Sequence, residues 1–497
     1  MSCRGLNGNF CVLVAAVLAA VTPVGCTKTG VAPVVAPAQP VDQSFRAQAP
    51  AAGAPQPLHA PVPQQRQLDN GLRVLAVEKP GLPLVHVRVI VRSGSAADPA
   101  DGLGMAGFVA SMLERGSTSR DARAVADAIE TRGATLHVSV DEDASTLSFT
   151  ALKENYGPVL EVLADILQDP AFAADEVERV RAERLAALTQ LDNDPPSAAT
   201  RVFRHVIYGD HPYGHSVLGQ REALKKIKPA ALRAFYRRLY RPANIAVVVV
   251  GDLDAEAMFA AVAERFSAWS DGEAGDAAVP PPEPAEPDPG IYLVERQGAP
   301  QSQLRIGHLG VSRSNEDYFA VVMCNAILGG LFNSRINMNL REDKGYTYGA
   351  RSTFDFLRSR GPFFVATGVR TDVTKEAIEE VFKEIDRMVA QGAVAEELQN
   401  AKNRYALSLP GSFQSVARIA GMVQNIFVYD LPVDYYQTLP EKIAAVTLDD
   451  VHRVAKTYLH SAALNIVVVG DRSKVETGLA ELKRGTVALC DAEGNIL

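Results

Sequence analysis

The sequence predicts an α+β protein made of two homologous mixed α/β domains joined by a Pro-rich linker. Residues 269–290 contain the run PPPEP among Gly, Ala and acidic residues, a composition that favours a connection over a packed element. On each side of this linker a strand-like valine run ends in Gly-Asp, at Gly251 and at Gly470. Each half is about 200 residues long, which suits a separate domain.

A constant spacing relates the two halves. Gly470 follows Gly251 by 470 − 251 = 219 residues. The same spacing relates two apolar stripes of helical period, which are Val159, Leu163 and Ile166 in the first half and Ile378, Phe382 and Ile385 in the second. Alternating residues at 85–89 and 147–149 predict strands in the first half. The repeat predicts homologous domains at 66–268 and 291–485, with antiparallel strands and long helices.

The composition is that of an ordinary globular protein. Of the 497 residues, 47% are hydrophobic and 22% charged, so burial can offset the entropy of folding. The net charge of −8 argues against a nucleic-acid partner.

The N-terminus has the pattern of a secretory signal. Residues 1–26 contain Arg4 and then an apolar run from Phe10 to Val24, which is shorter than a membrane span and contains Pro23. The sequence VGC at 24–26 resembles the end of a bacterial lipobox, although a Leu-like residue usually precedes it. Lipidation of Cys26 and ordinary cleavage both remain open. In either case we expect export to the bacterial periplasm, with anchoring as a lipoprotein if Cys26 is lipidated.

A Pro- and Ala-rich tether should follow the signal. Residues 27–65 contain few charges and favour an extended chain. Beyond it the only cysteines in the sequence are Cys324 and Cys490. Two cysteines so far apart are no disulfide framework, so we expect two buried free thiols.

Residues 104–113, GMAGFVASML, resemble the zinc-binding helix of the pitrilysin/insulinase-type peptidase family, the inverzincins. In that family H-x-x-E-H follows a similar lead, and two imidazoles hold zinc while the carboxylate takes a proton from the bound water. The corresponding residues here are Gly107, Ala110 and Ser111. The resemblance therefore implies a two-domain clamshell whose first domain has lost its metal-binding residues.

The third zinc ligand of the family is a Glu on a helix that precedes an Asp-Pro turn. The turn corresponds to residues 192–195, and the helix before it offers Ala186 and Ala187. Glu183 lies one turn earlier and is expected to be an exposed helix residue. His211 and His215 have the spacing of a helical metal pair, but the Pro and Gly between them predict a structural loop. We expect no metal and no cofactor in this chain.

The second half resembles the other functional segment of the family. Residues 328–335 (LGGLFNSR) and 339–348 (NLREDKGYTY) contain Arg341 and, seven residues later, Tyr348. In known members this pair grips the substrate backbone and donates to the oxygen that gains charge in peptide hydrolysis. The alternative is that these residues only end a helix and begin a strand.

The resemblance implies a division of labour. In heterodimeric processing peptidases one chain carries zinc and the other does not, and this sequence resembles the zinc-free chain. We expect it to pair with an H-x-x-E-H-bearing homologue that holds the zinc, and to supply Arg341 and Tyr348 for the cleavage of peptides. A peptide-binding or scaffold protein of the cell envelope is the rival hypothesis. A peptidase with another mechanism is disfavoured, since no Ser-His-Asp or Cys-His motif is recognisable.

Overall fold

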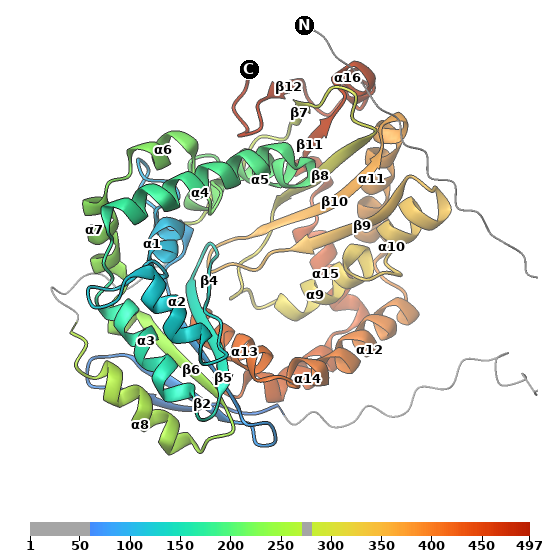
Figure 1. The fold of residues 1–497 in the computed structure, drawn as a ribbon. Helices are drawn as coiled ribbons and strands as arrows, with labels where there is room; N and C mark the ends of the chain where they lie inside the picture. Colours follow the sequence, from blue (N-terminus) through green and yellow to red (C-terminus); the bar gives the residue numbers. More distant parts are fainter. Residues whose placement is uncertain (1–59, 271–280) are drawn as a thin grey trace, which may run out of the picture. The chain divides into compact units, whose positions relative to one another are not determined.

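The computed structural model describes residues 60–270 and 281–497, and these form two mixed sheets flanked by helices (Figure 1). The signal, Cys26, most of the tether and residues 271–280 of the linker lie outside the described residues. The first sheet has the strand order β1-β2-β6-β3-β5-β4 and the second β12-β7-β11-β8-β10-β9. The five strands β2-β6-β3-β5-β4 thus correspond in order to β7-β11-β8-β10-β9. The predicted fold of two homologous mixed α/β halves is confirmed.

The strands of the first sheet are β1 (Gln64–Gln67), β2 (Arg73–Glu78), β3 (Leu84–Val91), β4 (His137–Val140), β5 (Ser145–Leu152) and β6 (Ile245–Gly251). Those of the second sheet are β7 (Ile291–Glu295), β8 (Gln301–Leu309), β9 (Thr347–Phe354), β10 (Pro362–Arg370), β11 (Asn465–Gly470) and β12 (Val487–Cys490). In both sheets a parallel pair (β2–β6 and β7–β11) adjoins an antiparallel set, and β12 adds a second parallel pair, with β7, to the second sheet.

The helices of the first half are α1 (Met105–Leu113), α2 (Ala122–Glu130), α3 (Tyr156–Gln168), α4 (Ala174–Asn193), α5 (Pro195–Tyr208), α6 (Arg221–Lys226), α7 (Pro229–Leu239) and α8 (Ala255–Phe266). Those of the second half are α9 (Tyr318–Asn325), α10 (Arg335–Asn337), α11 (Thr374–Gln391), α12 (Ala395–Ser412), α13 (Val416–Val428), α14 (Tyr435–Ala445), α15 (Leu448–Tyr458) and α16 (Arg472–Glu481). Two π-helical segments, η5 (Ala326–Gly330) and η6 (Met338–Asp343), flank α10.

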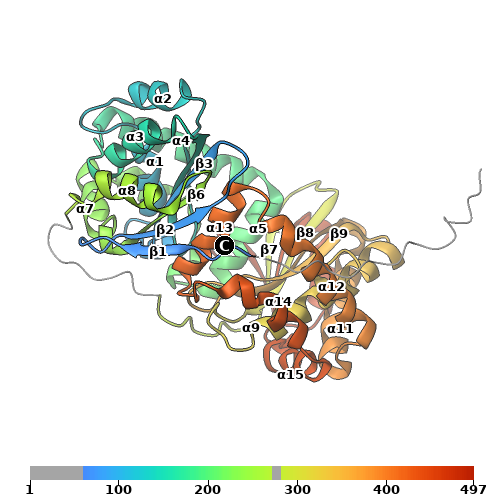
Figure 2. The same cartoon turned by 90° about the horizontal axis from the view of Figure 1, so that it is seen from below.

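The two halves exchange one helix each. Helix α5 of the first half packs on β8 and β11 of the second sheet, and α13 of the second half packs on β3 and β6 of the first (Figures 1 and 2). This explains why every residue of β6 and β11 is buried, since each strand is covered on both faces. Alternate residues of β6 belong to different cores: Val247 and Val249 face the helices of their own half, while Val248 packs in the core that includes α13.

An arginine marks the exchange in each half, half-buried in the first half and buried in the second. Arg88 of β3 lies opposite Val248 and Arg305 of β8 lies opposite Val467, and these two valines are 467 − 248 = 219 residues apart. Arg88 donates to Gln424 Oε1 of α13 at 3.0 Å. Arg305 Nε donates to the Thr200 hydroxyl of α5 at 3.0 Å, and burial lowers the pKa of Arg305 to about 10. The repeat therefore extends to the polar contacts of the exchanged helices.

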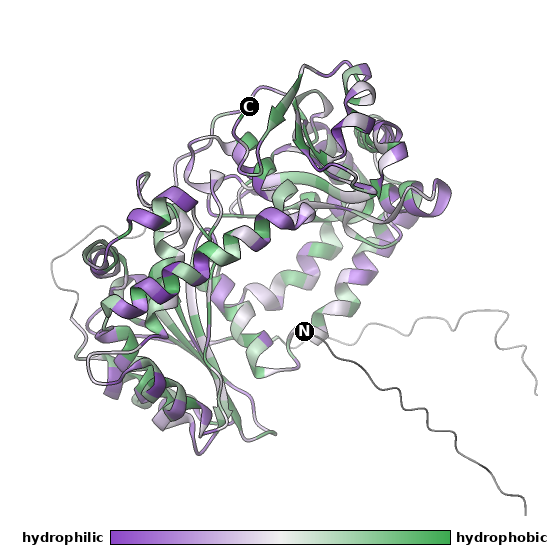
Figure 3. Cartoon of the chain, turned by 45° about the horizontal axis from the view of Figure 1, so that its top comes forward, coloured by the Kyte–Doolittle hydropathy of each residue, from purple (hydrophilic) through white to green (hydrophobic). Residues whose placement is uncertain are grey.

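The helices are amphipathic, with hydrophobic residues toward the sheets and hydrophilic residues on their outer sides (Figure 3). The two predicted stripes are buried in α3 and α11. Both predicted free thiols, Cys324 and Cys490, are also buried. One helical stretch, Tyr318–Asp343, is long and apolar enough to cross a membrane by length and composition, but 56% of its most apolar window is buried inside the protein, as in a core helix.

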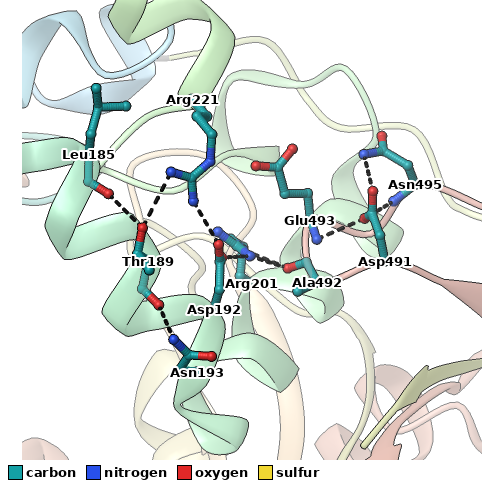
Figure 4. Close-up of polar contacts among 10 residues, drawn as sticks. All are labelled: Leu185, Thr189, Asp192, Asn193, Arg201, Arg221, Asp491, Ala492, Glu493 and Asn495. Atoms are coloured by element: carbon teal, nitrogen blue, oxygen red, sulfur yellow. Dashed lines mark hydrogen bonds and ion pairs between the residues drawn. The ribbon is translucent and has the colours of Figure 1, made fainter.

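The described strands extend past the expected domain limits. Strand β1 begins at Gln64, ahead of residue 66, and β12 ends at Cys490, beyond residue 485. The segment after β12 returns to the first half, where Arg201 of α5 donates from Nε to the Ala492 carbonyl at 2.8 Å (Figure 4). Arg201 also pairs with Asp192, which accepts from Arg221 at 2.9 Å. The C-terminal residues are thus part of the packed body.

Candidate functional site

Helix α1 has the place of a metal-binding helix but is filled with small and apolar side chains. All its residues except Ser111 are buried. Ser111 donates from Oγ to the Gly107 carbonyl at 2.9 Å, a bond within its own helix. The carboxylate of Asp98 caps the helix by accepting from the backbone N–H groups of Gly104 and Ala106 at 2.6 and 2.7 Å. The polar groups of α1 are therefore satisfied locally.

An arginine occupies the space in front of Gly107. Arg184 of α4 is 8% exposed and donates from Nη2 to the carbonyls of Val217 and Leu218 at 2.8 and 3.0 Å. Burial lowers the pKa of Arg184 to about 10, while Asp98 opposes the change, so the guanidinium remains charged near neutral pH. A fixed positive charge thus lies where a zinc-binding histidine would project from α1.

The packing around Gly107 leaves no room for a side chain. A Cβ at this position would lie 2.5 Å from Arg184 Nη2 and 2.8 Å from the Val217 carbonyl oxygen. Zinc needs imidazole, thiolate or carboxylate ligands, and Gly107, Ala110 and Ser111 with a guanidinium beside them offer none of these. The residues of this site do not fit zinc.

Helix α4 does not supply a ligand either. Ala186 is exposed and Ala187 half-buried, and Glu183 points away to pair with Arg115 at 2.8 Å, with about half of its side chain exposed. Glu183 is therefore an exposed helix residue, as expected. Sequence reasoning missed Arg184, although a signal was present: it shares its helical stripe with Val177, Val180 and Leu188, the other buried residues of α4.

The two loop histidines have structural partners. His211 donates from Nε2 to the Pro282 carbonyl at 2.7 Å, and His215 Nε2 lies 3.0 Å from the buried carboxylate of Asp98. Pro212–Gly214 between them form a single 3-10 turn. No group of three or more His, Cys, Asp or Glu side chains suited to a metal occurs among the described residues.

Arg341 lies in the π-helical segment η6, a rare conformation that is frequent at functional sites. Its guanidinium stacks over the Phe332 ring at 4.8 Å and pairs with Glu342 at 3.1 Å. About 40% of the Arg341 side chain is exposed, and Phe332 is 63% exposed. Arg341 is therefore available to a ligand and is held from one side by an aromatic ring.

Tyr348 lies on a β-bulge at the start of β9. Thr347 pairs with Val369 and Ala350 with Thr367, so Tyr348 and Gly349 together face the single residue Gly368. The Thr347 hydroxyl fixes the bulge by donating to the Gly368 carbonyl at 2.7 Å and accepting from the Gly349 N–H at 3.0 Å. Bulges re-aim side chains near active sites, and here the phenol of Tyr348 is 90% exposed.

Asn337 connects the two parts of this segment. It is buried, donates from Nδ2 to the Phe332 carbonyl at 2.6 Å and accepts the Ala350 N–H at 3.0 Å. Asn337 thereby connects the turn at Phe332, whose ring contacts Arg341, to strand β9, which carries Tyr348. Segment η6 packs on α10, α11 and β9, whereas α1 packs on α4, α7 and the strands β4 and β5 of the first half. The two predicted halves of the site are thus built on separate cores.

Comparison with known families accounts for both halves. Residues 73–221 match the model of the insulinase family (peptidase family M16), and residues 226–405 match that of the peptidase M16 inactive domain. The chain belongs to the insulinase family, peptidase family M16. The resemblance seen in residues 104–113 and 339–348 is confirmed. Since α1 lacks the ligands and the base, this M16 chain is a catalytically inactive member.

Relatives of the chain cover nearly its whole described body. A protein of Mycobacterium tuberculosis named a zinc protease is 26% identical over 83% of this chain and 94% of its own length. A Helicobacter pylori protein named a non-peptidase homologue is 22% identical over 79% of this chain and 90% of its own length. The relatives of this chain thus include proteins named as zinc proteases and a protein named as a non-peptidase homologue.

Solved structures show the same fold. The peptidase M16 inactive domain from Pseudomonas fluorescens superposes with a TM-score of 0.77 at 29% identity, covering 82% of this chain and 98% of that one. The first half of the periplasmic protease PqqL from Escherichia coli superposes with a TM-score of 0.69 at 17% identity, covering 85% and 94%.

We expect the isolated protein to bind no stoichiometric zinc and to hydrolyse no peptide. The reason is the donor set of α1 and α4, in which a guanidinium replaces the ligands. Elemental analysis of the purified protein after dialysis against zinc-containing and then zinc-free buffer measures this. About one tightly held zinc per chain would mean that the metal site lies elsewhere.

Proposed function

We propose that this chain is the zinc-free subunit of a peptidase, which pairs with an H-x-x-E-H-bearing homologue and supplies Arg341 and Tyr348 for the hydrolysis of peptides. The partner would hold the zinc and activate the water. This chain would close the chamber, bind the substrate backbone through Arg341 and donate the Tyr348 hydroxyl to the oxygen that gains charge.

The observation that carries the proposal is the contrast between the two segments. Around Gly107 the polar groups bond within the first half, Ser111 to the Gly107 carbonyl and Arg184 to the carbonyls of Val217 and Leu218, while Tyr348 is 90% exposed on a bulge that its neighbours hold in place. A large aromatic side chain that served only to start a strand would gain nothing from such exposure. An exposed phenol on a rigid support is suited to a ligand or a partner surface.

The exposure of Tyr348 also supports the proposal of a second subunit. In water a single hydroxyl contributes little to charge stabilisation, because the solvent competes for the same oxygen. The same donor contributes far more in a site from which water is excluded. A partner that covers β9 would create that environment, and the guanidinium of Arg341 would then provide a charge-assisted contact to the substrate.

The rival proposal is a peptide-binding or scaffold protein of the cell envelope. It is favoured by the name of the Helicobacter pylori relative, a non-peptidase homologue. The two proposals differ in one assay, in which the chain is mixed with an H-x-x-E-H homologue from the same genome. The subunit proposal requires that the pair cleaves peptides faster than the homologue alone, and equal rates would favour the scaffold.

For the N-terminus we propose export to the bacterial periplasm and anchoring through a diacylated Cys26. The basis is the apolar run of residues 10–24, the sequence VGC at 24–26 and the Pro- and Ala-rich stretch after it. The expected mature chain begins at Cys26 and fractionates with membranes, which mass spectrometry of the N-terminus would measure. A free N-terminus at another residue, with the protein in the soluble periplasm, would remove the anchor.

A further inference from the structure

The segment Arg221–Arg241 is strongly basic within an acidic protein. It contains eight Lys and Arg residues and one acidic residue, Glu222, while the whole chain has a net charge of −8. Six of the basic side chains are exposed along α6, α7 and the turn between them, and these are Lys225, Lys226, Lys228, Arg233, Arg237 and Arg238. Glu222 pairs with Lys225 at 2.6 Å, which leaves a surplus of positive charge on this surface.

A cavity of about 650 Å³ opens within this basic surface. It lies between the loop before α1, the start of α1, and helices α6 and α7, which are neighbours in Figure 1. Met105, Ile227 and Phe235 form an apolar floor, and each of them is also part of the core of the first half. The volume is within the range of about 300–1,000 Å³ typical of small-ligand sites, which combine apolar walls with a few polar groups.

Two positively charged side chains line the cavity. Lys226 and Arg238 both line it, and Arg238 is held in place by a bond to the Ala97 carbonyl at 3.2 Å and by stacking 5.5 Å from the Phe235 ring. Asp101 and Glu222 also line the cavity. Glu222 is paired with Lys225, and Asp101 offsets one of the two cations, so the cavity keeps a surplus of one positive charge, to which the exposed Lys228 and Arg237 nearby add.

We propose that this cavity binds a small anionic amphiphile, a compact apolar group that carries one carboxylate or phosphate. Met105, Ile227 and Phe235 would contact the apolar part, and Lys226 and Arg238 the anion. The surrounding basic surface would attract such a ligand from solution. The proposal is independent of the subunit role, because it uses no residue of the Arg341–Tyr348 segment.

The test uses the full mature chain and octanoate as the probe, with octanol as its uncharged match, both below their aggregation concentrations. Calorimetric titration should give one saturable octanoate site and binding of octanol weaker by at least about tenfold, the loss expected for one charge-assisted contact. Equal affinity for octanol, or octanoate binding that does not saturate, would overturn the proposal. Inorganic phosphate that competes as strongly as octanoate would overturn the role of the apolar floor.

Variants locate the site. Lys226→Ala and Arg238→Ala should each weaken octanoate binding about tenfold. Ala234→Trp, which fills the cavity from an exposed helical position, should abolish binding without altering a charge. Arg237→Ala is the matched control, because Arg237 is exposed on the same helix and does not line the cavity. A loss from Arg237→Ala equal to that from Lys226→Ala, or full binding by Ala234→Trp, would contradict the proposed location.

Discussion

Replacing Tyr348 by Phe is expected to lower the turnover of the reconstituted pair on the order of 10²-fold, the loss typical of one donor to a developing oxyanion. The change removes only the hydroxyl, and the side chain is 90% exposed in this chain, so neither folding nor assembly should suffer. Steady-state peptide hydrolysis measures the effect. Size-exclusion chromatography and melting temperature must accompany it, so that a folding defect is not taken for a catalytic one.

Tyr346→Phe is the matched control for this prediction. Tyr346 is in the same segment but is half-buried against the core of the second half, so loss of its hydroxyl should leave the turnover unchanged. Arg341→Ala should lower kcat and also raise KM, because it removes a substrate contact that is made before the transition state. If Tyr348→Phe and Arg341→Ala both assemble and cleave at the wild-type rate, the two residues have no catalytic role and the scaffold proposal is the better one.

Replacing Gly107 by His is expected to destabilise the chain by about 3 kcal/mol or more, the upper part of the range for overpacked cores. The new side chain would meet Arg184 and the Val217 carbonyl at distances that atoms do not adopt, and a backbone carbonyl cannot move aside as a side-chain end can. Denaturant unfolding of the single variant measures the loss. Gly157→His is the control, because Gly157 is also helical and its nearest neighbour is the Arg265 guanidinium at 3.8 Å.

The same packing predicts that introducing the H-x-x-E-H residues into α1 does not by itself create a zinc site. The triple variant Gly107→His, Ala110→Glu, Ser111→His should bind no zinc, because the buried Arg184 guanidinium both fills the space and repels a cation. Zinc content after dialysis is the measurement. A triple variant as stable as the wild type that holds one zinc per chain would show that Arg184 does not block the site.

The repeat made most of the fold predictable. The 219-residue spacing between Gly251 and Gly470 predicted that the strands ending there, β6 and β11, are equivalent, and the helical stripes did the same for α3 and α11. The exchange of α5 and α13 between the sheets could not be predicted. Equivalent positions in a repeat show that two helices correspond, but they do not show which sheet each one covers.

The candidate site was predictable in its residue types but not in its geometry. The absence of His and Glu from residues 104–113 is plain in the sequence, whereas the bulge that exposes Tyr348 depends on pairing with β10 and on the bond from Thr347 to the Gly368 carbonyl. Arg184 was hidden for a different reason. A charged residue in a polar helix is normally predicted to face the solvent. The burial of Arg184 is favourable only because the carbonyls of Val217 and Leu218, in a loop more than 30 residues later, accept its hydrogen bonds.

If this chain works with a zinc-bearing homologue, the two should be purified together, and purification of the tagged chain from its own cells tests this most directly. Mass spectrometry of the complex should identify an H-x-x-E-H-bearing M16 protein in near-equal amount, in a fraction that cleaves peptides. Recovery of the chain without any such homologue, under conditions that keep complexes intact, would contradict the account.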